Sequence, residues 1–160
     1  MSERERAYQY LLKLLAVRPR TVREAQRRLR GKGFPSEVVE DVIARAREEG
    51  LLDDPLFARL YTEDRAFRRP RAKRLIEQEL VRKGIPPELA RAAVEASLGD
   101  KDDRELAREA LRRRLPALEG LPREVALRRA FSYLLRRGFA PGIAREVVRE
   151  LLGRGGSEEG

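Results

Sequence analysis

One short segment occurs three times along the 160-residue chain. Each copy has a leucine, then a basic residue, a glycine and an apolar residue, and the copies read Leu29-Arg-Gly-Lys-Gly-Phe34, Leu80-Val-Arg-Lys-Gly-Ile85 and Leu134-Leu-Arg-Arg-Gly-Phe139. Aligning Gly33, Gly84 and Gly138 gives offsets of 51 and 54 residues, and apolar positions continue to coincide on both sides. A period near 50 residues is typical of supersecondary units that bury their apolar faces only against one another. The sequence therefore predicts a repeat protein.

Apolar residues recur at helical spacing in each repeat, and no segment alternates apolar and polar residues over the length of a strand. Gly33, Gly84 and Gly138 are predicted to end helices in the left-handed conformation, and Thr21 is predicted to cap one. Residues 116–120 indicate a looser connection, with one helix ending before them and the last helix reaching residue 152. The prediction is an all-α fold of three tandem three-helix repeats in an elongated, curved array, right- or left-handed. The predicted limits are 1–50, 51–99 and 100–153 for the repeats and 154–160 for a disordered tail.

Composition excludes several classes of function. The chain has no cysteine and no histidine, so it offers no disulfide, thiolate nucleophile, imidazole base or usual zinc ligand. It has no apolar signal core near its start and no run approaching the roughly 18 apolar residues of a membrane span. We expect a cytoplasmic protein without a membrane partner.

Two acidic pairs, Asp53-Asp54 and Asp102-Asp103, are the candidates for a metal site or an acid and base pair. Each pair stands just before a predicted helix, so helix capping is the favoured interpretation. The glycines around Lys32 follow a helix rather than a strand, which argues against a phosphate loop. No catalytic residue, cofactor or metal is predicted.

The charge balance favours an anionic partner. The net charge is +9, and the 36 basic residues comprise 31 arginines and only 5 lysines. Genome composition or a hot habitat is the alternative explanation of the excess. Some basic positions recur in the repeat, however, as Arg23, Arg74 and Arg128 do.

A basic stripe is predicted opposite the apolar face of the second helix, formed by Arg20, Arg23, Arg27 and Arg30. A further group gathers at the corresponding place in the second repeat. The residues predicted to bind a partner or nucleic acid are Arg20, Arg23, Arg27, Arg68, Arg69, Arg71, Arg74, Arg128, Arg129 and Arg136. Phe131 falls on an apolar register and is predicted to pack between repeats, with base stacking as the less favoured alternative.

The segment Gly50-Leu-Leu-Asp-Asp-Pro-Leu-Phe-Ala58 resembles the G-hydrophobic-D-D-x-x-F-A signature of the RecX family of recombination regulators. Arg18-Pro-Arg-Thr21 and the three glycine-ended segments resemble that family in the same order. The resemblance covers roughly residues 6–152. The chain departs from the family pattern in its short ends and in its arginine-rich second helices.

This resemblance implies a non-enzymatic modulator of the RecA recombinase, acting in homologous recombination and DNA repair. It implies a monomer that binds in the groove of the RecA filament on single-stranded DNA and inhibits ATP hydrolysis and strand exchange. Two other classes remain open on the residues alone: a basic helical module that acts directly on DNA, and a helical scaffold for another acidic protein. An enzyme is the least favoured class.

Overall fold

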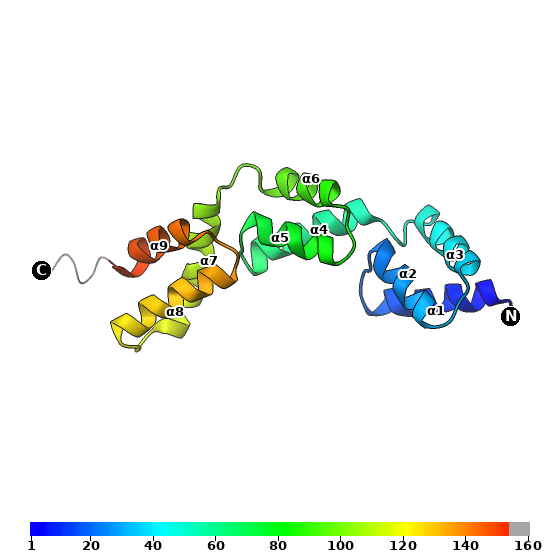
Figure 1. The fold of residues 1–160 in the computed structure, drawn as a ribbon, viewed down its shortest axis with the longest axis horizontal. Coiled ribbons are helices and arrows are strands. Elements are labelled where there is room, and N and C mark those ends of the chain that lie inside the picture. Colours follow the sequence, from blue (N-terminus) through cyan, green and yellow to red (C-terminus); the bar gives the residue numbers. More distant parts are fainter. Residues whose placement is uncertain (154–160) are drawn as a thin grey trace, which may run out of the picture. The chain divides into compact units, whose positions relative to one another are not determined.

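A computed structural model describes residues 1–153, which form nine α-helices and a final π-helical turn and contain no β-strand (Figure 1). The all-α prediction is confirmed for this part of the chain, and the predicted tail over 154–160 lies outside it. The helices are α1 (Glu3–Val17), α2 (Val22–Gly31), α3 (Ser36–Glu48), α4 (Asp54–Arg68), α5 (Lys73–Arg82), α6 (Pro87–Leu98), α7 (Asp103–Leu118), α8 (Arg123–Arg136) and α9 (Pro141–Val148), followed by the turn Arg149–Gly153.

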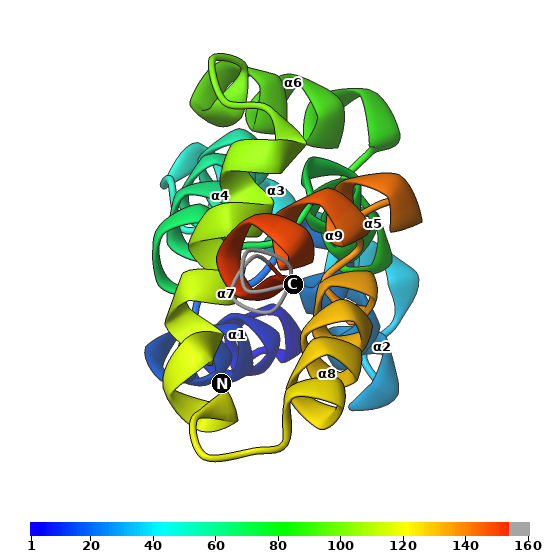
Figure 2. The same ribbon diagram turned by 90° about the vertical axis from the view of Figure 1, so that its left-hand side faces the viewer.

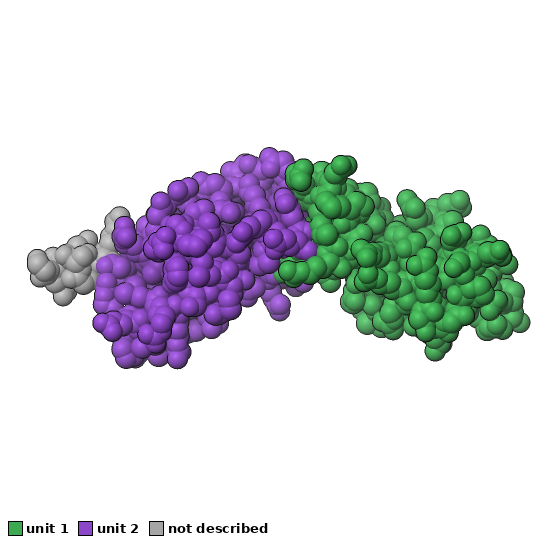
Figure 3. All heavy atoms as spheres, viewed as in Figure 1, with its two compact units in different colours: residues 1–61, 79–93 green, residues 62–78, 94–160 purple. Residues whose placement is uncertain are grey.

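The chain divides into two compact units that do not follow the repeats (Figure 3). Unit 1 contains residues 1–61 and 79–93, and unit 2 contains residues 62–78 and the chain from residue 94 onward. Helices α4, α5 and α6 each contribute residues to both units. Part of the second repeat therefore belongs to the same compact unit as the first repeat, and the rest belongs to the same unit as the third.

In unit 1, helices α1, α2 and α3 pack against one another around a common apolar core. Leu11, Leu29 and Val39 have no exposed surface, and they stand on the helical registers that the sequence pattern predicts. The start of α2 is fixed by a capping box, in which the Thr21 side chain accepts from the Glu24 N–H and the Glu24 carboxylate accepts from the Thr21 N–H. The predicted N-cap is confirmed.

In unit 2, helices α7, α8 and α9 form the corresponding bundle, and Figures 1 and 2 both show α7 beside α8. Two predicted helix limits are wrong. Helix α7 continues through Pro116 to Leu118, where the burial of Leu118 offsets the single N–H hydrogen bond that the proline lacks. Helix α9 ends at Val148, and the chain continues as the π-helical turn to Gly153 rather than as an α-helix to Leu152.

The repeated six-residue segment is a helix C-terminus. Gly33, Gly84 and Gly138 have φ angles of +101°, +101° and +88°, which confirms the predicted left-handed position. The apolar residue after each glycine donates its N–H to the carbonyl of the segment's leucine, over 3.0 to 3.3 Å. This pattern of hydrogen bonds defines a Schellman motif and explains why leucine, glycine and an apolar residue recur together.

The glycine turn of the second repeat also packs against α2. The Thr21 hydroxyl donates to the Lys83 carbonyl over 2.5 Å. A Cβ added to Gly84 would lie 2.4 Å from the Cβ of Arg23, so the absence of a side chain permits this close approach. The turn thus ends one helix and contacts the beginning of another.

The same junction recurs one repeat later, within unit 2. The Ala72 N–H donates to the Arg137 carbonyl over 2.9 Å, and Arg74 Nε donates to the Gly138 carbonyl over 2.6 Å. Ala72 and Arg74 occupy the registers of Thr21 and Arg23. The repeat therefore preserves a contact between successive repeats as well as the helices themselves.

The acidic pairs complete these junctions. The first carboxylate of each pair caps its own helix, since Asp53 Oδ1 accepts from the Leu56 N–H and Asp102 Oδ1 from the Glu105 N–H. The second reaches back to the preceding repeat. Asp54 Oδ1 lies 3.0 Å from the Val22 nitrogen of α2, and Asp103 Oδ1 lies 3.4 Å from the Lys73 nitrogen of α5. The capping interpretation is confirmed, and no group of three or more potential metal ligands occurs within residues 1–153.

Replacing Asp54 with alanine should destabilise the protein by about 1 kcal/mol, because the first turn of α2 loses a side-chain acceptor. Asp41→Ala is the matched control. It removes an exposed carboxylate 2.6 Å from Arg4, an ion pair expected to contribute at most about 0.5 kcal/mol. Urea denaturation measures both changes, and equal losses would show that the Asp54 contact adds nothing beyond its charge.

Candidate nucleic-acid interface

A cleft of about 390 Å³ lies beside α8 and is lined by five residues: Arg114, Arg128, Arg129, Ser132 and Arg136. Three of them, Arg128, Arg129 and Arg136, are predicted binding residues that the structure brings together. Sequence reasoning missed Arg114, which α7 contributes. Its signal was the run of three consecutive arginines over residues 112–114. We call these five residues the α8 cleft.

The α8 cleft is strongly cationic. Four of its five lining residues are arginines and none is acidic. No ion pair engages them within the described chain, although the Arg114 guanidinium lies 5.1 Å from the centre of the Tyr133 ring. Guanidinium groups remain charged at all physiological pH values and present a planar set of donors that matches phosphate oxygens. The cleft can therefore bind phosphate or carboxylate groups.

The basic stripe on α2 is shorter than predicted. Arg23 and Arg27 are exposed, but Arg20 precedes the N-cap of α2 and is only 8% exposed. Its Nε is buried and has no hydrogen-bond partner in the described chain. Burial lowers the pKa of the Arg20 guanidinium, and the nearby charges of Arg18 and Arg28 lower it further. The prediction that Arg20 continues an exposed stripe is wrong, because the helical spacing does not extend past Thr21.

The predicted group in the second repeat is divided in the same way. Arg68 and Arg69 are exposed, and Arg68 lies 3.4 Å from a carboxylate oxygen of Asp64. Arg71 is only 6% exposed and donates from Nε to the Arg69 carbonyl. Arg74 is exposed, yet its Nε contacts the Gly138 carbonyl at the junction between repeats.

Arg20 and Arg71 share one register of the repeat, which Val125 occupies in the third repeat. Val125 is half-buried. A register that is buried or half-buried in every repeat is a packing position, so the recurrence of arginine there does not by itself indicate binding. Arg23, Arg27, Arg68 and Arg69 keep exposed side chains, as do the three predicted residues of the α8 cleft.

The helices and the α8 cleft define an all-helical repeat protein with a basic surface and no described cluster of metal ligands. Three family models match it in chain order. They are described as the first, second and third three-helix domains of RecX and match residues 7–45, 53–94 and 102–148. The chain belongs to the RecX family, and its fold is three tandem three-helix repeats.

Individual relatives agree with this assignment. The chain is 39% identical over 153 residues to the regulatory protein RecX of Thermobifida fusca, covering 96% of this chain and 82% of that one. It is 37% identical to the regulatory protein RecX of Streptomyces coelicolor, covering 96% and 81%. The crystal structure of RecX from Lactobacillus salivarius has the same fold, with a TM-score of 0.71 at 19% identity over 93% of this chain and 96% of the other. None of the helices within residues 1–153 has the length and hydropathy needed to cross a membrane.

Proposed function

We propose that this chain binds the groove of a RecA filament on single-stranded DNA and inhibits its ATP hydrolysis and strand exchange. Membership of the RecX family in all three repeats carries the proposal. The α8 cleft supports it, because three predicted arginines gather there without acidic partners in the described chain. The protein would act as a regulator without chemistry of its own.

Inhibition without chemistry requires that the protein bind one arrangement of the filament better than another. A ligand shifts such an equilibrium only by its difference in affinity for the two states. Three repeats on one chain supply several binding surfaces, so one molecule can contact more than one recombinase protomer. Because the repeats are linked, the overall affinity then exceeds that of a single repeat. Binding across protomers would bias the filament against its active arrangement and block the incoming duplex.

The test is ATP hydrolysis by RecA on single-stranded DNA while the protein is titrated in. Turnover should fall at less than one molecule per recombinase protomer. The triple variant Arg128→Gln, Arg129→Gln, Arg136→Gln should reach the same inhibition only at a concentration at least about tenfold higher. One lost charge-assisted hydrogen bond costs at least about 1.5 kcal/mol, which corresponds to that factor. The matched control carries Arg47→Gln, Arg59→Gln and Arg112→Gln, which remove three exposed charges outside the α8 cleft.

Two results would contradict the proposal. Unchanged ATP turnover despite binding to the filament would reject inhibition. Equal loss in the two triple variants would show that net charge, rather than the α8 cleft, determines binding. If inhibition disappears when free single-stranded DNA is in excess, the alternative of a module that acts directly on DNA is favoured.

A further inference from the structure

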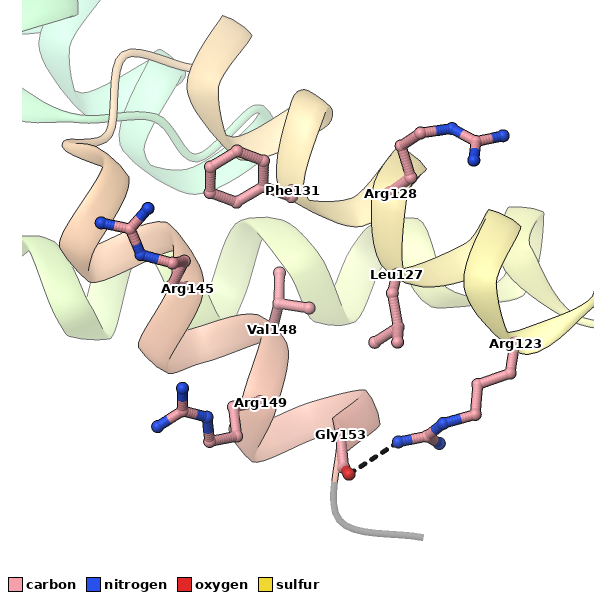
Figure 4. A pocket seen from close by; sticks show the side chains of 8 residues that line it. All are labelled: Arg123, Leu127, Arg128, Phe131, Arg145, Val148, Arg149 and Gly153. Atoms are coloured by element: carbon pink, nitrogen blue, oxygen red, sulfur yellow. Dashed lines mark hydrogen bonds between the residues drawn. The ribbon is translucent and has the colours of Figure 1, made fainter. Parts of the chain in front are cut away.

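Unit 2 contains a second groove, between α8 and α9, with a volume of about 550 Å³ (Figure 4). Its apolar lining is formed by Leu127, Phe131 and Val148. Gly153 and arginines from α8, from α9 and from the turn after α9 complete the lining, and the arginines are Arg123, Arg128, Arg145 and Arg149. We call this site the α8–α9 groove. It shares Arg128 with the α8 cleft.

The charge of the groove follows from how α9 distributes its side chains. The acidic residues of α9 and the turn after it pair with α7: Arg104 Nε lies 2.7 Å from Glu146, and Arg108 Nε lies 2.8 Å from Glu150. The Arg104 hydrogen bond and charge lower the pKa of Glu146, which keeps that carboxylate ionised. The neighbouring positions 145 and 149 are arginines that line the α8–α9 groove without acidic partners in the described chain.

One arginine is held by the backbone. The Arg123 guanidinium donates to the carbonyls of Leu152 and Gly153 over 3.0 and 2.7 Å, and Figure 4 marks the second bond. Arg145 and Arg149 have exposed side chains and no such bonds within residues 1–153. These two guanidinium groups are therefore available to a ligand.

Phe131 does not have the role that its apolar register suggested. The equivalent positions in the first two repeats are Gln26 and Glu77, so repeat packing does not require an aromatic residue there. The phenyl ring is half-buried and lies at the groove between α8 and α9 in Figure 4. Phe131 therefore lines an open groove, whereas the sequence predicts that it packs between repeats.

We propose that the α8–α9 groove binds single-stranded nucleic acid directly, with one base packed on Phe131 and the adjacent phosphates bound by Arg145 and Arg149. Proteins bind single-stranded nucleic acid with aromatic rings beside basic groups, because each nucleotide supplies one flat base, which stacks on a ring, and one phosphate, which a guanidinium group binds. The inference deepens the proposed function, on which it rests for the presence of single-stranded DNA. It places a direct DNA contact on the third repeat.

The test measures fluorescence anisotropy of a labelled oligothymidylate of about 12 nucleotides, without recombinase. An abasic oligonucleotide of the same length keeps the phosphates and removes the bases. Polyglutamate of equal charge serves as an unlabelled competitor and represents an acidic peptide. Circular dichroism confirms that each variant remains folded.

The variant Phe131→Leu keeps an apolar side chain and should weaken binding of the oligothymidylate about fivefold, with little effect on the abasic strand. The double variant Arg145→Gln, Arg149→Gln should weaken binding of both strands and reduce the logarithmic salt slope by about 1.4, or roughly 0.7 for each phosphate contact. Its matched control, Arg59→Gln with Arg112→Gln, removes two exposed charges outside the groove.

Three outcomes would overturn the inference. Equal effects of the two double variants would assign binding to net charge. A base contact would be excluded if the wild-type protein bound the abasic strand as tightly as the oligothymidylate and Phe131→Leu changed neither affinity. Displacement of the oligothymidylate by polyglutamate at equal charge concentration would favour an acidic peptide as the occupant. Because recombinase is absent, each outcome is separate from the ATP hydrolysis assay and leaves its result unaffected.

Discussion

Replacing Gly84 with alanine is expected to destabilise the protein by about 2–6 kcal/mol, clearly more than the same replacement at Gly33. Both glycines have φ of +101°, so either alanine incurs a backbone strain of about 1–3 kcal/mol. Only at Gly84 would the new Cβ collide with a neighbour, since it would lie 2.4 Å from the Cβ of Arg23, whereas nothing lies within 4 Å at Gly33. Overpacking of this kind adds about 1–3 kcal/mol.

Urea denaturation of both variants measures the difference. Arg23→Gly removes the atoms that would collide, so combining it with Gly84→Ala should give a smaller loss than the sum of the single variants. Equal destabilisation by the two alanine substitutions would mean that the Arg23 contact does not constrain the turn. It would also remove the structural reason for glycine at Gly84 beyond its backbone conformation.

The glycine turns could be predicted because their determinants are local. Six consecutive residues suffice to form a Schellman motif, and its repetition reveals the period. The partner of each turn could not be predicted in the same way. Nothing in the alignment of repeats indicates that the Lys83 carbonyl meets Thr21, or that Asp54 contacts the first turn of a helix some 30 residues earlier. Contacts between repeats depend on packing in three dimensions.

The basic residues show where a sequence pattern fails as a guide to binding. Helical spacing selected Arg20 and clustering around one turn selected Arg71, yet both are buried, because neither pattern indicates what covers a residue in the folded chain. Recurrence passed over Arg145 and Arg149, because their registers carry glutamate or alanine in another repeat. A site built in only one repeat leaves no periodic trace, so the α8–α9 groove could be recognised only after α8 and α9 were placed side by side.

Phe131 illustrates the same limit for apolar residues. Its register predicts burial when read within α8 alone, but burial depends on what covers that face of the helix. In the structure Val148 of α9 lines the same groove as Phe131, and the groove is open. Helical periodicity identifies which face is apolar and not whether that face becomes core or a binding surface.

Truncation after Gly99 should destabilise the second repeat, in addition to removing the third. Residues 62–78 belong to the same compact unit as the chain from residue 94 onward. Without α7 and α8, the Ala72 N–H loses the Arg137 carbonyl, the Lys73 N–H loses Asp103, and Arg74 Nε loses the Gly138 carbonyl. Three hydrogen bonds at about 1 kcal/mol each correspond to about a hundredfold change in the equilibrium for local opening.

Amide hydrogen exchange measures this opening directly. The amides of Leu75 and Ile76, in the first turns of α5, should exchange about a hundredfold faster in the truncated protein. Amides of α3, such as that of Val42, provide an internal control because α3 lies wholly in unit 1. Unchanged protection of Ile76 would show that the second repeat stands without the third. With the expected result, weaker filament binding by the truncated chain would reflect a loosened second repeat as well as the loss of a third binding surface, so its affinity alone could not measure avidity.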